Sequence, residues 1–558
     1  LNLVMRGSSR LNISSDSLSD HAAIGFNVEG LEVPDLALLQ RYIPANWPFE
    51  FYGGQGVVYG GLLLEPTALK VDLNLDSEEA HVGVRQYRFT TDLDAALKLD
   101  NPSILTERTA IGGSYIHLGD AVVASDADVE SKPWEASLKF THGYLGFLSD
   151  EAKAAQSDVV DLLKLMGKSE ARRLLGDSMG LIGFQAQVSS LAWIGVLLGE
   201  KHQTSIAGNG TVEGDIHLAG GWPWTGTRLE VLSPALEVGV LDYLSRGDGE
   251  ITLDVRDGAE NPGWMLNIML RDADMKRRGE ELAFIHNVDL ALEALLEDML
   301  PGRQQRDFAL RFRIDSGEVE DMSVFNSYLP PDSPMVFTAG TADLQADILL
   351  LPEDARGGLS LVSQALEAEV GEQSITGDLR ADITVAGGTP REMEFDITGS
   401  QVRLDKVAVA GERESFDGDY WSALITLTRA ETTWTRPPKI SADAALTISD
   451  SRPIVAMFDN QGYRPKWLSG MLTLEDISGK ARLEVADHAM VIPMARVISD
   501  KAEFAAKARI AGESRDGVIY ARYNKLDALL RITAGKSNLD VIKVREKFDN
   551  YVVPVPLE

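Results

Sequence analysis

Apolar and polar residues alternate along most of the chain. In residues 378–385, Leu379, Ala381, Ile383 and Val385 alternate with Asp378, Arg380, Asp382 and Thr384, and residues 93–99 repeat the pattern with Leu93, Ala95, Leu97 and Leu99. Successive side chains of a strand point to opposite faces, so each segment predicts a strand with one apolar and one polar face. Further alternating segments are 249–255, 401–409, 439–448 and 471–477, and Gly-rich turns such as 386–388 separate them. We therefore predict long antiparallel meanders.

Two segments have apolar residues at helical spacing instead. In residues 150–176 these are Val159, Leu162, Leu163, Met166 and Leu174. In residues 287–300 they are Leu290, Leu292, Leu295, Leu296 and Met299. So few helices disfavour the alternating strand–helix order of nucleotide-binding α/β folds. The expected fold class is mainly β: elongated antiparallel meander sheets, curled into a gutter or packed as a sandwich, with a few helices that cap or cover one edge.

The chain repeats itself at an offset of 286 positions. Residues 25–33 align with 311–319, Tyr42 with Tyr328, Gly54 with Gly340, and residues 62–66 with 348–352, while Trp134 meets Trp421 one position out of phase. An insertion of roughly thirty residues near 150–180 shortens the offset in the second half of each copy. The pattern predicts two tandem β-rich modules, residues 1–300 and 301–558, the first with the helical insertion near 150–180 and the helix near 287–300.

Composition excludes several classes of function. The chain of 558 residues carries 53 Lys and Arg against 85 Asp and Glu, a formal charge of −32. That excess argues against nucleic acid as a partner and against electrostatic docking on an anionic membrane. Cysteine is absent, which removes disulfides, thiolate nucleophiles and zinc–thiolate sites. The longest apolar run, residues 191–198, is far shorter than the ~20 residues of a membrane-spanning helix. Any signal or anchor is expected to lie outside this sequence.

The search for catalytic or metal-binding motifs yields one weak match. Residues 176–180 read G-x-S-x-G, in which Ser178 would be the nucleophile of a serine hydrolase. That motif works where a strand turns sharply into a helix, whereas the segment before Ser178 is predicted to be helical. The eight histidines form no H-E-x-x-H or H-x-H pattern, so no metal ligand is predicted. His117 aligns with Arg403, which indicates a solvent-facing position.

Runs such as residues 397–411 and 471–485 resemble the AsmA-like superfamily, which includes TamB-type and related large envelope proteins of Gram-negative bacteria. The resemblance covers most of residues 20–150 and 300–535 and lies in the succession of strand, glycine turn and strand. It implies a periplasmic body, an inner-membrane anchor outside this sequence, possible envelope protein partners and a role in outer-membrane biogenesis. It also implies a long sheet curled into a gutter, whose apolar interior conducts phospholipid acyl chains between membranes.

The leading hypothesis is therefore a non-catalytic, cofactor-free protein that binds or guides the acyl chains of phospholipid or a similar ligand along an apolar β-groove. Its candidate lining residues are Leu93, Ala95, Leu97, Leu99, Leu379, Ala381, Ile383, Val385, Leu472 and Leu474. One alternative is a structural scaffold of closed β-sandwich modules, since period-two alternation fits both an open and a closed sheet. A minor alternative is a hydrolase that uses Ser178.

Overall fold

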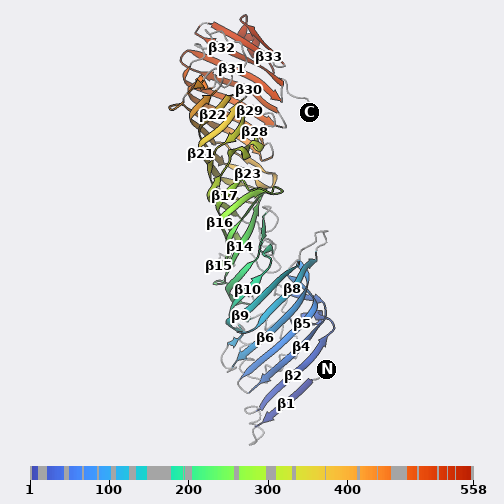
Figure 1. Ribbon diagram of the computed structural model, residues 1–558. Coiled ribbons are helices and arrows are strands. Elements are labelled where there is room, and N and C mark those ends of the chain that lie inside the picture. The colour runs from blue at the N-terminus through green and yellow to red at the C-terminus, as the bar shows by residue number, and fades with distance from the viewer. Residues whose placement is uncertain are drawn as a thin grey trace.

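The computed structural model shows one long, continuous antiparallel β-sheet (Figure 1). The fold class predicted from the alternation, mainly β with meandering antiparallel strands, is confirmed. The structure describes residues 3–9, 22–42, 49–65, 68–84, 87–101, 108–124, 133–147, 178–192, 194, 204–220, 222–256, 263–296, 309–329, 335–370, 373–410, 415–416, 418–435, 438–453, 474–486, 489–511, 514–524, 526–533 and 536–553.

In the first half of the chain the strands are β1 (Leu3–Ser9), β2 (Ala22–Val33), β3 (Phe49–Gly53), β4 (Gly56–Leu64), β5 (Leu69–Val84), β6 (Tyr87–Asn101), β7 (Thr109–Ala110), β8 (Tyr115–Ala124), β9 (Trp134–Phe147), β10 (Ser178–Val188), β11 (Ser205–Ala207), β12 (Gly210–Ala219), β13 (Trp222–Pro223), β14 (Arg228–Val240), β15 (Tyr243–Arg256), β16 (Gly263–Arg277) and β17 (Ile285–Leu296).

In the second half they are β18 (Leu310–Val319), β19 (Met335–Ala339), β20 (Ala342–Leu350), β21 (Ala355–Val370), β22 (Gln373–Val385), β23 (Gly387–Thr389), β24 (Glu394–Asp396), β25 (Gln401–Ala410), β26 (Ser415–Phe416), β27 (Ser422–Thr433), β28 (Lys439–Asp450), β29 (Glu475–Ala486), β30 (Ala489–Ile498), β31 (Ala502–Ala511), β32 (Ser514–Tyr523), β33 (Leu526–Thr533) and β34 (Lys536–Asp540).

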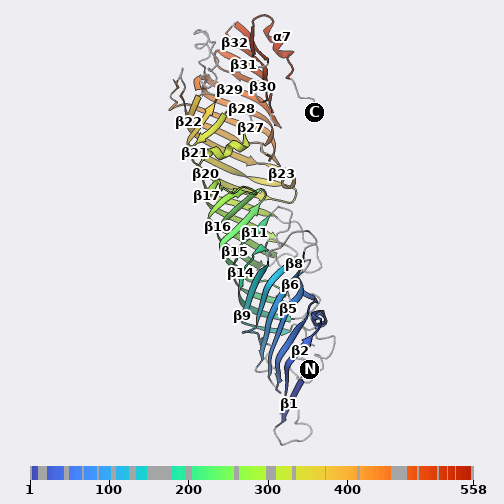
Figure 2. The same ribbon diagram turned by 45° about the vertical axis from the view of Figure 1, so that its right-hand side comes forward.

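Long strands pair with their neighbours in chain order, from β1 through β2, β4, β5, β6, β8, β9, β10, β12 and β14 to β18, and on through β20, β21, β22, β25 and β27 to β34. The remaining short strands flank the ends of the long ones. Strands cross the molecule obliquely, so the sheet is narrow and elongated, with the two ends of the chain at opposite ends (Figures 1 and 2).

The two faces of this sheet differ in polarity. Paired residues of an antiparallel sheet share a face, so a line of pairs can be followed from strand to strand. Across seven central strands one line is wholly apolar: Val212, Val231, Ile251, Ile268, Leu292, Phe312 and Ile348. The line one residue away, on the opposite face, is Glu213, Glu230, Thr252, Asn267, Glu293 and Arg311. We call the first the inner face and the second the outer face.

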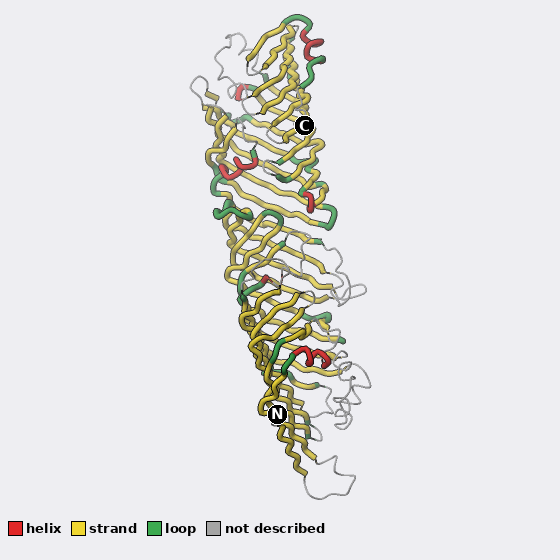
Figure 3. The backbone as a smooth tube through the Cα atoms, turned by 90° about the vertical axis from the view of Figure 1, so that its right-hand side faces the viewer, coloured by secondary structure: helices red, strands yellow, loops and turns green. Residues whose placement is uncertain are grey.

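The main hydrophobic core lies on the inner face at the centre of the molecule. It runs from Phe184 to Leu366, and Ile268 and Leu292 are each only 1% exposed. A flat single sheet would leave both exposed. Their burial follows because the sheet curls around its long axis and packs its inner face against itself. Figure 3 shows the long, narrow sheet from the side.

The prediction of a helix at residues 287–300 is wrong for the residues that the structure describes, because Ile285–Leu296 forms strand β17. The apolar residues at even positions, Val288, Leu290, Leu292, Ala294 and Leu296, are all buried, whereas Leu295 is 43% exposed. The helical spacing came from counting Leu295 with that set, and Met299 lies outside the described residues. Direct pairing with both β16 and β18 determines the strand.

Elements recur at the sequence offset of 286. The 3₁₀ helices η1 (Leu36–Tyr42) and η2 (Met322–Tyr328) each begin with a backbone N–H that donates to a glycine carbonyl, Leu36 to Gly54 (2.7 Å) and Met322 to Gly340 (2.8 Å). Both glycines have positive φ, 94° and 119°, which explains why glycine occupies both positions. However, β17 pairs with β18 and the main core spans residue 300, so the two predicted modules share one sheet. Whether each module folds as a separate unit stays a prediction.

The other helices that lie wholly within the described residues are short. They are η3 (Pro390–Glu392) and α7 (Val544–Asp549), which packs Val544 and Phe548 against Tyr520 and Leu529 near the end of the sheet. The helix predicted at residues 150–176 lies outside the described residues. The next described element of the chain is β10, which begins at Ser178. Among the described residues, no helix has the length and apolar character that crossing a membrane requires.

Candidate functional site

The inner face carries an apolar stripe along most of the molecule. The line of paired residues described above begins at Leu31 on β2 and reaches Val385 on β22, with only apolar or glycine residues in it. A second line starts at Leu361, passes through Ala381, and ends at Ala528 on β33, again without a polar side chain. Together the two lines cover nearly the whole length of the sheet.

The predicted lining residues lie on this inner face wherever the structure describes them. Leu93, Ala95, Leu97 and Leu99 alternate along β6, and Leu379, Ala381, Ile383 and Val385 alternate along β22. Leu474 is buried in a second core cluster with Val409 and Ile477, and Leu472 lies outside the described residues. The two groups are separate: only Ile383 and Val385 reach the central cavity described next.

An apolar cavity of about 380 Å³, partly open to solvent, lies on the central part of the inner face. Its floor comes from neighbouring strands, with Phe312 and Ile314 of β18, Ile348 of β20, Leu359 of β21, and Ile383 and Val385 of β22. None of the described residues that line it is charged. Its volume falls within the ~300–1,000 Å³ typical of small-molecule sites, and a mostly apolar lining suits a hydrocarbon ligand.

The groove is more open toward the N-terminal end. There Leu97 and Ile116, on the same inner face, are 43% and 39% exposed. Exposed apolar side chains in a row are unusual on a soluble protein surface. The packed core around Ile251, Ile268 and Leu292 separates them from the cavity. The site therefore combines an open section with an enclosed one.

Side chains from opposite rims of the sheet close the enclosed section. Tyr243 and Tyr328 lie at the rim formed by the β14–β15 turn and by η2, whereas Trp434 follows β27 at the other rim. Trp434 Nε1 donates to Tyr243 Oη at 3.2 Å, and the Trp434 and Tyr328 rings are 5.7 Å apart. We call Tyr243, Tyr328 and Trp434 the seam.

The seam shows directly how strongly the sheet curls. Tyr243 begins β15 and Trp434 directly follows β27. These strands are eight pairing steps apart, or roughly 38 Å in a flat sheet at ~4.8 Å per strand. Side chains at that separation meet only if the sheet curls around on itself. Seam and cavity thus belong to one feature, a curled section of the sheet whose rims meet at the seam.

Burial holds the Tyr328 phenol in one protonation state. The Tyr243 and Tyr328 hydroxyls are 2.8 Å apart, and burial, more than the neighbouring Tyr243, raises the pKa of Tyr328 well above its ordinary value. Tyr328 therefore stays neutral at physiological pH and keeps its hydrogen bond with Tyr243. The Arg277 guanidinium stacks behind them, 4.7 Å from the Tyr328 ring centroid, with its Nε 3.7 Å from Asp242 Oδ2.

Only weak, non-covalent contacts join the two rims at the seam. One hydrogen bond contributes about 0.5–1.5 kcal/mol net, and each aromatic pair adds about 0.5–1.5 kcal/mol. The seam is then worth roughly 1–3 kcal/mol in total. Closed states favoured by a few kcal/mol coexist with a minor open population.

The outer face carries the charge of the protein in solvated pairs. Arg311 donates to both carboxylate oxygens of Asp347, at 2.9 and 2.6 Å, and these hydrogen bonds hold the pKa of Asp347 below its usual value. Arg380 does the same for Asp382 on β22. Exposed ion pairs of this kind contribute little to stability. Their main effect is to keep the outer face polar and solvated.

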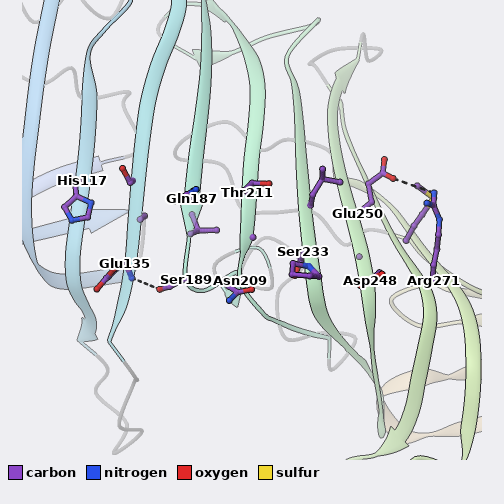
Figure 4. Close-up of a pocket in the computed structure, with 18 residues that line it drawn as sticks. His117, Glu135, Gln187, Ser189, Asn209, Thr211, Ser233, Asp248, Glu250 and Arg271 are labelled. Atoms are coloured by element: carbon purple, nitrogen blue, oxygen red, sulfur yellow. Dashed lines mark hydrogen bonds and ion pairs between the residues drawn. The ribbon is translucent and has the colours of Figure 1, made fainter.

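A shallow hollow on the outer face is polar and lacks a catalytic arrangement (Figure 4). It crosses β8 to β16, and His117, Gln187, Thr211 and Glu250 line it with the charged Arg271. Two polar contacts lie within it, a Glu250–Arg271 ion pair (3.8 Å) and a hydrogen bond (2.6 Å) that the Glu135 backbone N–H donates to Ser189 Oγ. His117 is exposed, as its alignment with Arg403 predicted. Nothing among these described residues pairs a nucleophile with a base.

Ser178 stands at the start of strand β10, where it pairs with Phe147 of β9. A nucleophile elbow requires a helix directly after the serine, and here a strand follows. Groups of three or more His, Asp or Glu side chains able to hold a metal ion are absent from the part of the chain that the structure describes.

Sequence reasoning identified Ile383 and Val385 but missed the other residues of the cavity floor and the residues of the seam. Leu344, Ala346, Ile348 and Leu350 alternate along β20 as clearly as the predicted segments do, so the same signal identifies them. Tyr328 stood out only as a repeat partner of Tyr42, and no pattern in the sequence links Tyr243 to Trp434, 191 positions later.

No family model, curated protein or solved structure matches this chain.

Proposed function

We propose that this protein binds the acyl chains of phospholipids, or of a similar amphiphile, along its inner face, and guides them without covalent chemistry. The observation that carries the proposal is the uncharged cavity of about 380 Å³ on the inner face. Each CH₂ transferred from water into such a groove contributes about 0.8 kcal/mol, so binding needs no catalytic residue.

The arrangement of polarity supports the same proposal. Charged residues cover the outer face, while the lines of paired residues along the inner face are apolar from β2 to β33. A groove open to one side holds a hydrocarbon chain and leaves its polar head in water. With the envelope location expected from the AsmA-like resemblance, the ligand would be a membrane lipid, the location the periplasm, and the partner the inner membrane through an anchor outside this sequence.

A structural scaffold is the second candidate, and the tight central packing favours it. Ile251, Ile268 and Leu292 are at most 2% exposed, so the enclosed section contributes a stable core of its own. A scaffold needs the core but not the cavity or the exposed inner-face residues such as Leu97. Ligand binding therefore separates the two candidates.

Affinity is expected to rise with the length of a fatty-acid chain. Since ~0.8 kcal/mol per CH₂ corresponds to about fourfold in Kd, a series from ten to eighteen carbons should bind about fourfold more tightly per added carbon until the chain outgrows the enclosed section. Displacement of a fluorescent fatty acid measures this series. The same Kd for every length, or no binding at all, would contradict the proposal and favour the scaffold.

A further inference from the structure

The seam bridges the side of the groove through which a polar head would protrude. In the open section an acyl chain lies on the inner face while its head stays in water. At the seam, Trp434 Nε1 reaches Tyr243 Oη (3.2 Å), and its ring contacts the ring of Tyr328. A head group that travels along this opening therefore meets a closed bridge of side chains.

We propose that the seam is a gate that selects ligands by their head group: an amphiphile with a large or charged head passes only when Trp434 separates from Tyr243 and Tyr328, whereas a fatty acid slides beneath the closed seam. The inference rests on the proposed function and adds to it the residues that decide which lipids pass. It applies to the enclosed section alone.

The lining of the cavity explains why a charged head has to stay outside. Among the described lining residues, the polar groups belong to Tyr243, Tyr328, Thr432 and Trp434, and none is charged. A phosphate drawn through this section would lose its water and find no cation among the described lining residues, since Arg277 stacks behind the Tyr243 and Tyr328 rings and lies 3.7 Å from Asp242. Such a transfer is strongly unfavourable. A carboxylic acid can shed its charge by taking up a proton, which a phosphodiester does far less readily.

The construction of the seam lets it open without unfolding the sheet. Trp434 is 36% exposed, and its backbone N–H is held on its own rim by the Met393 carbonyl (2.8 Å). Its contacts with the opposite rim are made by the side chain. Rotation of the Trp434 indole therefore releases the bridge, while the pairing of β27 with β28 and of β14 with β15 stays intact.

A crosslink across the seam tests the gate, and the absence of native cysteine makes the chemistry specific. In the full chain, Tyr243→Cys and Trp434→Cys are combined and joined by a bismaleimide. The control joins Thr252→Cys to Asn267→Cys, which are paired neighbours on the outer face and do not span the rims. The probes are a fatty acid and a phosphatidylglycerol that carry the same photoactivatable acyl chain, and mass spectrometry of the labelled peptides reports entry into the cavity.

With the seam locked, we expect phosphatidylglycerol to label the cavity peptides of β20–β22 at least about tenfold less than it does in the crosslinked control. The fatty acid should label these peptides equally in both proteins. Without the crosslinker, the double variant should take up phosphatidylglycerol faster than the native chain. Equal labelling by phosphatidylglycerol in the locked and control proteins would overturn the gate. Failure of both probes to label the native chain would instead overturn the proposed function itself.

Trp434→Ala provides a second measurement without any crosslink. Loss of the indole removes the bridge from an exposed position, so the fold should persist and phosphatidylglycerol should enter roughly tenfold faster. An unchanged entry rate in this folded variant would also contradict the gate.

Discussion

Ile383→Asp is expected to abolish acyl-chain binding and leave the sheet folded. Ile383 is half-buried on the inner face, where it packs beside Ile397 and also lines the cavity, so the new carboxylate has open space on its cavity side. Water that enters along the groove can hydrate it, and a hydrated charge removes the apolar surface on which a hydrocarbon chain depends.

The matched control is Thr384→Asp, one residue along β22 on the exposed outer face. It adds the same charge to the same strand and should change neither binding nor folding. Fluorescent fatty-acid binding and circular dichroism measure the two properties separately. If Ile383→Asp unfolds the protein while Thr384→Asp does not, the inner face is a closed core and the scaffold is the better account.

Leu292→Ala should destabilise the centre of the sheet by about 2–5 kcal/mol, and Leu295→Ala by about 0.5 kcal/mol or less. Both leucines lie on β17, but Leu292 is 1% exposed on the inner face and Leu295 is 43% exposed on the outer face. Removing the buried side chain leaves a hole in the main core, whereas removing the exposed one leaves only water in its place.

This pair also tests the secondary structure of the segment. Residues three apart share one face of a helix, so a helix would make the two substitutions similarly costly. A long sheet need not unfold in one step, so the loss of stability has to be measured locally. Hydrogen exchange of peptides from β16 and β17 gives the local opening free energy of each variant. Equal losses for both variants would contradict the strand and its register.

The sequence predicts the two faces of the sheet well, because alternation is a local property. Leu379, Ala381, Ile383 and Val385 lie on the inner face as expected, since a strand can only direct every second side chain to the same side. The failure at residues 287–300 has the same origin: where polar residues are few, as from Leu290 to Leu296, periods of two and 3.6 both fit.

Curvature could not be predicted in this way. Alternation decides which face a residue occupies but not how sharply the sheet turns, and closure at Trp434 and Tyr243 depends on the accumulated twist of eight strand pairs. The cavity and the seam arise from that closure, so they have no local signature. The recurrence of Gly54 at Gly340 is different, because a single backbone conformation with positive φ selects glycine at both positions.

Acyl-chain binding is tested most directly by lipid mass spectrometry on the full chain purified gently and without detergent, beside an unrelated soluble protein prepared in parallel. We predict phospholipid or fatty acid in stoichiometric amount with this protein and not with the other, and its loss in Ile383→Asp. Well-folded protein that carries no lipid after contact with membranes would contradict the account.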